Sequence, residues 1–188
     1  MPLKVNEKEL IKGCMKGKTT AQQSLFSLLS PTLLGICLRY AKDSSEAQDF
    51  LQESFIKIFK NLGQFEFKGS FEGWAKRITV NTCLYNLKKN GPILEDIDIV
   101  DLEVNNTIPD VIEQLSATEL LHSINQLPDG YRMVFNLYAI EGMSHREISE
   151  QLDIKESTSR SQLVKARKFL KDVITQDHNY YYENKQVG

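Results

Sequence analysis

Apolar residues recur every three or four positions along most of this chain, which is the spacing that places them on one face of an α-helix. The clearest run consists of Ala47, Phe50, Leu51, Phe55, Ile58, Phe59 and Leu62. Pairs typical of helix starts precede several such runs: a small polar residue is followed three positions later by Glu or Gln, as at Ser45 and Gln48 or Ser144 and Glu147. No stretch alternates convincingly between apolar and polar residues as a half-buried strand would. The sequence therefore predicts an all-α fold.

The expected helices form two groups separated by a segment without helical periodicity. They are predicted over residues 6–15, 20–30, 31–40, 45–61 and 70–89, and then over 110–124, 128–142, 145–152 and 157–174. Pro31 is expected to end one helix and begin the next. We therefore expect two small helical domains, 1–90 and 110–176, joined by a linker over 91–109 and followed by a polar, frayed tail over 177–188.

Charge is strongly segregated along the chain, although the net charge of the 188 residues is only -2. Residues 57–90 carry a balance of +5 and residues 154–171 also carry +5, whereas residues 91–119 carry eight acidic residues and no Lys or Arg. Two basic segments that flank an acidic linker point to nucleic acid as a partner. Solvated charged faces are the alternative interpretation of the same pattern.

Several classes of protein are excluded or disfavoured by composition. No apolar run approaches the roughly 18 residues of a membrane span, and the N-terminus lacks the apolar stretch of a signal peptide. The three cysteines have neither a disulfide framework nor metal-ligand spacing, so we expect a reduced, cytoplasmic protein whose cysteines serve packing. No glycine-rich phosphate loop, catalytic triad or histidine ligand set is present. We expect no enzymatic activity, no metal and no cofactor.

The C-terminal basic segment predicts a helix-turn-helix. A helix that begins at residue 145 buries Ile148 and Leu152, a short break follows, and a second helix begins near Ser157. One side of the second helix carries Ser159, Leu163, Ala166 and Leu170, and the other carries Thr158, Ser161, Lys165 and Lys168, flanked by Arg160, Gln162 and Arg167. Hydroxyls, amides and cations are the groups that read base edges and bind phosphates.

Three patterns, in order along the chain, resemble extracytoplasmic-function (ECF) sigma factors, the smallest class of bacterial sigma subunits. The first is Asp49-Phe-Leu-Gln52-Glu53-Ser-Phe55, and the second is Gly69-Ser-Phe71-Glu-Gly-Trp74-Ala-Lys-Arg77-Ile78-Thr-Val-Asn81. The third comprises Leu127-Pro128, Val134-Phe135, Glu141-Gly142, Ser144, Glu147-Ile148 and Ala166-Arg167. The resemblance covers about residues 20–175 and implies a transcription initiation factor that directs core RNA polymerase to promoters.

The resemblance assigns roles to three groups of residues. The group expected to bind the clamp helices of the polymerase comprises Asp49, Gln52, Glu53, Ile56 and Lys60. The group expected to recognise and help melt the minus-ten element comprises Phe65, Phe67, Lys68, Trp74, Lys76, Arg77, Asn81, Lys88 and Lys89, where aromatic rings can stack on unpaired bases. The group expected to read the minus-thirty-five element comprises Arg146, Thr158, Arg160, Ser161, Gln162, Lys165, Arg167 and Lys168.

Further partners implied by the resemblance are the polymerase flap, beside the helix-turn-helix, and an anti-sigma factor. Departures from the family pattern are Asp153 in place of a turn Gly, Ser159 in place of an apolar residue, Gln162 in place of Arg, and Tyr85 in place of Asp. They keep two alternatives open, which are a DNA-binding regulator that ignores polymerase and a sigma-like decoy that binds an anti-sigma factor without directing initiation.

Overall fold

The computed structural model describes residues 7–89 and 116–185, with side chains except at residue 117 and beyond residue 175. Over these residues the chain is all-helical, which confirms the predicted fold class. It divides into two units, residues 1–90 and 91–188, which are described separately. The predicted acidic linker, 91–109, lies outside the described residues.

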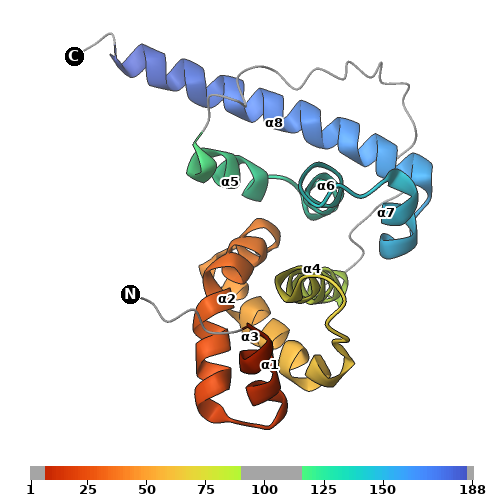
Figure 1. Cartoon of the computed structure of the whole chain (residues 1–188). Coiled ribbons are helices and arrows are strands. Elements are labelled where there is room, and N and C mark those ends of the chain that lie inside the picture. Colours follow the sequence, from red (N-terminus) through yellow and green to blue (C-terminus); the bar gives the residue numbers. More distant parts are fainter. Residues whose placement is uncertain (1–6, 90–115, 186–188) are drawn as a thin grey trace. The chain divides into compact units, whose positions relative to one another are not determined.

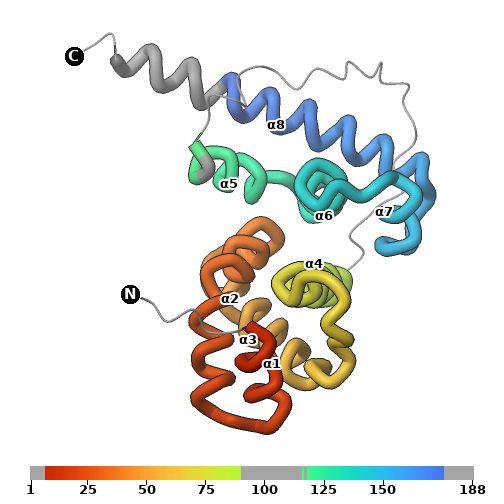
Figure 2. The backbone as a smooth tube through the Cα atoms, in the orientation of Figure 1, coloured from red at the N-terminus to blue at the C-terminus, as the bar shows by residue number. Residues whose placement is uncertain are grey.

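In the N-terminal unit, the described residues form four α-helices and one short 3₁₀ turn. Their bounds are α1 Glu7–Met15, α2 Thr19–Tyr40, α3 Ser44–Asn61, η1 Leu62–Gln64 and α4 Phe71–Lys89. After a turn in which Gly17 adopts a left-handed φ of 72°, α1 and α2 lie side by side (Figure 2). Helix α2 also packs against α3 and α4, so it is the central helix of this unit.

Helix α2 is continuous through Pro31, so the predicted break at this residue is wrong. Proline lacks the N–H that would reach the carbonyl of Ser27, which weakens a helix. The helix continues because Leu29, Leu33 and Ile36 form one buried stripe on both sides of the proline. Packing of that stripe outweighs the missing hydrogen bond.

Helix α2 is also long and apolar enough, by length and composition, to cross a membrane. The lack of an uninterrupted apolar run predicts no membrane span, but α2 contains a single charged residue, Arg39. Its Leu25, Leu33 and Cys37 are fully buried inside the N-terminal unit. The apolar character of α2 therefore contributes to the core of this domain.

In the C-terminal unit, the described residues form α5 Ala117–Asn125, α6 Asp129–Phe135, a π-helical turn η3 Asn136–Ile140, α7 His145–Leu152 and α8 Glu156–Lys185. Helix α8 runs beside α5, α6 and α7 (Figure 1). It continues beyond the predicted end at Ile174, into the segment expected to be a frayed tail.

Side-chain capping marks the starts of α3, α5 and α7. Ser144 and Glu147 form the predicted capping box of α7, with the Ser144 N–H donating to Glu147 Oε2 over 2.8 Å. Ser116 and Glu119 form a second capping box at α5, and the helix start that we predict at residue 110 lies outside the described residues. At α3 the cap is Asp43, whose side chain accepts from the Glu46 N–H, and Ser45 lies inside the helix.

Candidate polymerase-binding and DNA-binding surfaces

The outer face of α3 carries the side chains assigned to polymerase binding. Asp49, Gln52, Ile56 and Lys60 are exposed and recur every three or four residues, opposite the buried stripe that faces α2 and α4. Ile56 is 66% exposed, which makes it the most exposed large apolar side chain among the described residues. The arrangement is an apolar centre ringed by polar and charged groups.

Glu53 differs from these four residues because it is half-buried and tied to its neighbours. Its carboxylate lies 2.8 Å from Lys57 Nζ and accepts a hydrogen bond from the side-chain amide of Asn86 on α4. Burial acts to raise the pKa of Glu53, but the hydrogen bonds and the charge of Lys57 outweigh it and leave the pKa lowered. Lys57 also lies over the ring of Tyr85, at 5.0 Å. Glu53 therefore helps to hold α3 against α4.

The loop between α3 and α4 contains a cluster of aromatic rings. The Phe65 ring lies 5.1 Å from Phe67, 5.0 Å from Phe71 and 5.5 Å from Trp74, measured between centroids. Phe65 is 6% exposed, so it belongs to the packed centre of this cluster and its predicted contact with DNA is not available in this structure. Phe67 and Trp74 keep accessible ring surface at its edge.

Phe67 holds an unusual backbone conformation. Its φ of 58° is left-handed, which bulky side chains rarely adopt, and its ring lies 5.6 Å from Lys8 Nζ. Lys68 beside it is exposed and paired with Glu66 over 2.6 Å. The loop thus presents one strained aromatic residue next to an exposed cation.

One exposed face of α4 carries Arg77, Asn81, Tyr85 and Lys88, spaced by three and four residues. Lys76, which pairs with Glu72 over 2.7 Å, and Lys89 flank this face. Tyr85 was the departure for which our sequence analysis gave no role. Its exposed ring lies among the cations, so it is a further candidate for stacking on a base.

The turn of the helix-turn-helix is made by Asp153 in a left-handed conformation, with φ 58° and ψ 52°. Its N–H donates to the carbonyl of Ser149, which satisfies the end of α7 in the way that a glycine usually does. Asp tolerates this conformation better than most residues other than Gly and Asn. The departure at this position therefore leaves the helix-turn-helix geometry intact.

The two sides of α8 differ sharply. The buried side consists of Ser159, Gln162, Leu163, Ala166, Leu170 and Ile174. The other side carries exposed Arg160 and Lys168 together with partly exposed Thr158, Ser161, Lys165 and Arg167. Arg146, the candidate on α7, is also exposed.

Gln162 was predicted to contact bases, and this prediction requires correction. The side chain is 4% exposed, and its Oε1 is buried without a hydrogen-bond partner. Position 162 lies about 60° around the helix from Ser159, still within the stripe that faces the rest of the unit. Its burial removes Gln162 from the candidate DNA surface of α8.

Several basic side chains of this surface contact neighbouring side chains of the same unit. Arg160 pairs with Glu156 over 2.7 Å, and Arg146 pairs with Glu150 over 3.3 Å, each one helical turn along. The Arg167 guanidinium lies 5.7 Å from the ring of Tyr138 in η3. Exposed ion pairs of this kind contribute little stability, so phosphate can replace the carboxylates at small cost.

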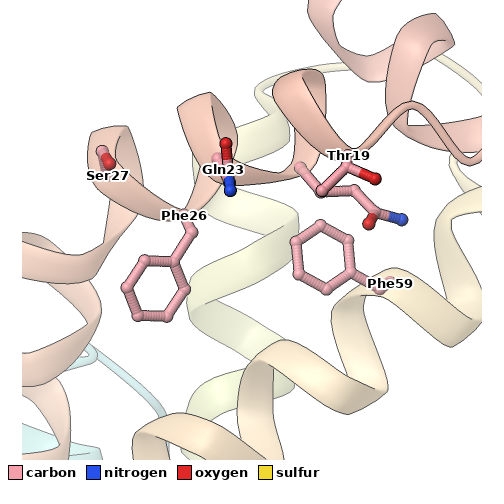
Figure 3. A pocket seen from close by; sticks show the side chains of 6 residues that line it. Thr19, Gln23, Phe26, Ser27 and Phe59 are labelled. Carbon is pink, nitrogen blue, oxygen red and sulfur yellow. The ribbon is translucent and has the colours of Figure 1, made fainter.

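A surface pocket of about 300 Å³ lies between α2 and α3, where the rings of Phe26 and Phe59 form one side (Figure 3). Its lining consists of Thr19, Gln22, Gln23, Phe26, Ser27 and Phe59 and carries no charge. The three cysteines are buried, and no group of three or more metal-ligating side chains occurs among the described residues. None of the candidate surfaces depends on these features.

Comparisons with known proteins agree with this division into two units. The family model described as Sigma-70 region 2 matches residues 25–93, and that described as Sigma-70, region 4 matches residues 117–170. The chain is 28% identical to the RNA polymerase sigma-H factor of Pseudomonas aeruginosa, over 86% of this chain and 90% of that protein. It is also 28% identical to the ECF RNA polymerase sigma-E factor of Haemophilus influenzae, over 93% and 98%.

Among solved structures, the fold is similar to that of the sigma factor RpoE from Bartonella quintana, solved in complex with the anti-sigma factor NepR. The TM-score is 0.51 at 17% identity, over 81% of this chain and 96% of that one. The chain belongs to the sigma-70 family, as an ECF RNA polymerase sigma factor. It therefore directs RNA polymerase to promoters, and its family is not enzymatic.

Proposed function

We propose that the two units divide promoter recognition between them, with the N-terminal unit acting on the minus-ten element and the C-terminal unit on the minus-thirty-five element. The observation that carries this assignment is the two-sided character of α8, whose buried stripe packs on its own unit while its other side presents basic and hydroxyl groups. A helix with such a free face, following a tight turn, suits the major groove.

In the N-terminal unit, the outer face of α3 binds the core polymerase. Exposed Ile56 supplies an apolar contact, and Asp49 with Glu53 meets basic groups of the clamp helices. Glu53 contributes in part by holding α3 against α4, since it contacts Lys57 and Asn86.

Minus-ten recognition falls to the loop before α4 and to the exposed face of α4. Phe67, Trp74 and Tyr85 offer rings for unstacked bases, while Lys68, Lys76, Arg77, Lys88 and Lys89 hold phosphates and Asn81 offers an amide. Aromatic and cationic groups close together suit a single strand, which promoter melting exposes.

In the C-terminal unit, the side chains that face the minus-thirty-five element are Thr158, Arg160, Ser161, Lys165, Arg167 and Lys168. Arg146 contacts the DNA backbone beside this element. The domains span 1–90 and 110–176, and the acidic linker, 91–109, threads through a basic channel of the polymerase. The protein acts in the cytoplasm and is held inactive by an anti-sigma factor.

The test uses promoter binding by the reconstituted holoenzyme at several salt concentrations. Lys165→Ala and Lys168→Ala should each reduce the slope of log affinity against log salt by about one unit, because each lost phosphate contact releases about one counterion fewer. Lys12→Ala on α1, exposed and outside every proposed surface, is the matched control and should leave the slope unchanged. Unchanged slopes in both α8 variants would show that this face does not bind DNA.

A further inference from the structure

Three elements of the C-terminal unit meet at one histidine. His145 is the first residue of α7, and its Nδ1 lies 2.9 Å from Ser159 Oγ on α8. Its ring stacks on Tyr138 in η3, with centroids 4.7 Å apart and planes 24° apart. A single side chain thereby links the first helix of the helix-turn-helix, its second helix and the π-helical turn before them.

Ser159 depends on this contact. It is 0% exposed and lies beside Leu163, Ala166 and Leu170 on the buried stripe of α8, where a hydroxyl has no packing advantage. A buried hydroxyl that lacks a partner is costly. The hydrogen bond to His145 meets that need and gives the packing of α7 on α8 a directional contact that apolar side chains would not supply.

The surroundings of the pair lower the pKa of His145. Burial and the nearby guanidinium groups of Arg160 and Arg167 lower the pKa of His145, against the opposing charge of Glu156. The ring also contacts Tyr138 and Ser159, as described above. The Arg167 guanidinium also lies 5.7 Å from the Tyr138 ring, so Tyr138 contacts both the histidine and a candidate DNA ligand.

We propose that His145 is a positioning residue for promoter recognition: its hydrogen bond to Ser159 and its stack on Tyr138 fix the orientation in which α8 presents its basic face to DNA. Thr158, Arg160 and Ser161 lie within one turn of Ser159, so a rotation of α8 at this point displaces them directly. This inference rests on the proposed role of α8 as the reader of the minus-thirty-five element.

The central test is a double-mutant cycle of His145→Phe and Ser159→Ala in the reconstituted holoenzyme. The Phe variant keeps a ring against Tyr138, and the Ala variant removes one hydroxyl, so neither disturbs the packing greatly. Each should weaken binding to a promoter duplex about tenfold at a temperature well below unfolding, and the double variant should be no weaker than the weaker single variant. The free energy of unfolding of each variant is measured in parallel.

One further variant and one pH dependence separate positioning from plain stabilisation. His145→Asn offers a polar atom near the position of Nδ1 and should recover part of the lost affinity. The affinity of the wild type divided by that of His145→Phe should fall as the pH is lowered from about 7.5 to about 5.5, because protonation places a third cation beside Arg160 and Arg167.

Loss of stability with unchanged promoter affinity in the folded variants would overturn the positioning role. A rise of the affinity ratio on acidification would also overturn it, since His145 would then act as a cation that binds phosphate. Lys168→Ala separates this failure from that of the proposed function. If Lys168→Ala weakens binding and the His145 and Ser159 variants do not, only the positioning role fails. If none of them does, α8 does not read DNA.

Discussion

Arg132 is the largest of the fully buried side chains among the described residues, and specific partners hold it. It is 2% exposed, and its guanidinium donates to Asp129 Oδ1 over 2.6 Å and to the carbonyl of Asn125 over 3.3 Å. The second bond satisfies a carbonyl at the C-terminal end of α5, so the side chain joins α6 to α5. A buried cation is tolerated because both contacts are made.

We expect Arg132→Ala to lower the free energy of unfolding by about 3 kcal/mol, because it breaks a buried pair and leaves space unfilled. Arg146→Ala is the matched control, since Arg146 pairs with Glu150 at the surface and should contribute less than about 1 kcal/mol. Denaturant unfolding of the full chain measures both values. Equal losses in the two variants would contradict the structural role of Arg132.

His145 gives stability a dependence on pH. Because the folded state lowers its pKa, the unfolded chain binds the proton more readily. The contribution of His145 is therefore present above its ordinary value of 6.5 and is lost as the pH falls below that value. The difference in unfolding free energy between the wild type and His145→Phe should shrink between pH 7.5 and pH 5.5, roughly, when followed by denaturant unfolding. A constant difference would mean that His145 does not titrate in this range.

At the scale of whole elements, packing decides more than local preference. Helix α2 passes through Pro31 because its buried stripe continues on both sides of the proline. The ring itself is exposed, so it makes no compensating contact in the core. The proline is thus tolerated by α2 and contributes little to its stability.

Pro31→Ala should raise the free energy of unfolding by up to about 3 kcal/mol, because it restores a helical hydrogen bond to Ser27 and removes a ring clash. Thermal or denaturant unfolding measures the change. Ser24→Ala, at another exposed position of α2, is the control and should change stability by less than about 0.7 kcal/mol. A loss of stability in Pro31→Ala would mean that the ring packs against a partner.

The proposed role of the outer face of α3 leads to a prediction about binding to core polymerase. Ile56→Asp should reduce binding to core polymerase by at least about tenfold without a large loss of stability, because Ile56 is 66% exposed. Leu28→Asp on α2 is the matched control, as Leu28 is 60% exposed and lies outside the proposed polymerase face. Equilibrium binding of each full-length variant to core polymerase measures the effect. Equal effects of the two substitutions would contradict the specific role of α3.

The helices themselves were largely predictable, because apolar spacing and capping residues are local signals. Ser144 with Glu147 marked α7, and Ser116 with Glu119 offered the same signal at α5. The π-helical turn of η3 has no such local signature. Gln162 was misplaced because polarity was taken as a sign of exposure, whereas contacts with other helices decide burial.

Within the candidate sites, the exposure of side chains was easier to predict than the contacts between them. The exposed side of α3 followed from helical periodicity, but the ties from Glu53 to Asn86 and from His145 to Ser159 join residues 33 and 14 positions apart. Such contacts depend on how helices cross, which a single sequence does not encode in any local pattern. The resemblance to ECF sigma factors gave the expected roles of these residues, and the structure gave the side chains that they contact.

At the scale of the whole molecule, the chain combines two helical units, each of which carries its own basic surface. The charge of residues 57–90 and of 154–171 is +5 in each case, and an acidic segment separates them. Each unit presents cations on one helix face while its core is formed by the opposite face of the same helix. The proposed division of promoter recognition predicts that specificity depends on both units engaging DNA at once.

Run-off transcription tests the central claim most directly. Purified core polymerase from the source bacterium is combined with this protein and fragmented genomic DNA, and the transcript starts are sequenced. We predict starts that share two upstream elements at a fixed spacing, and we predict their loss with Ile56→Asp. An absence of starts, with the same core active in the presence of another sigma factor, would contradict the account.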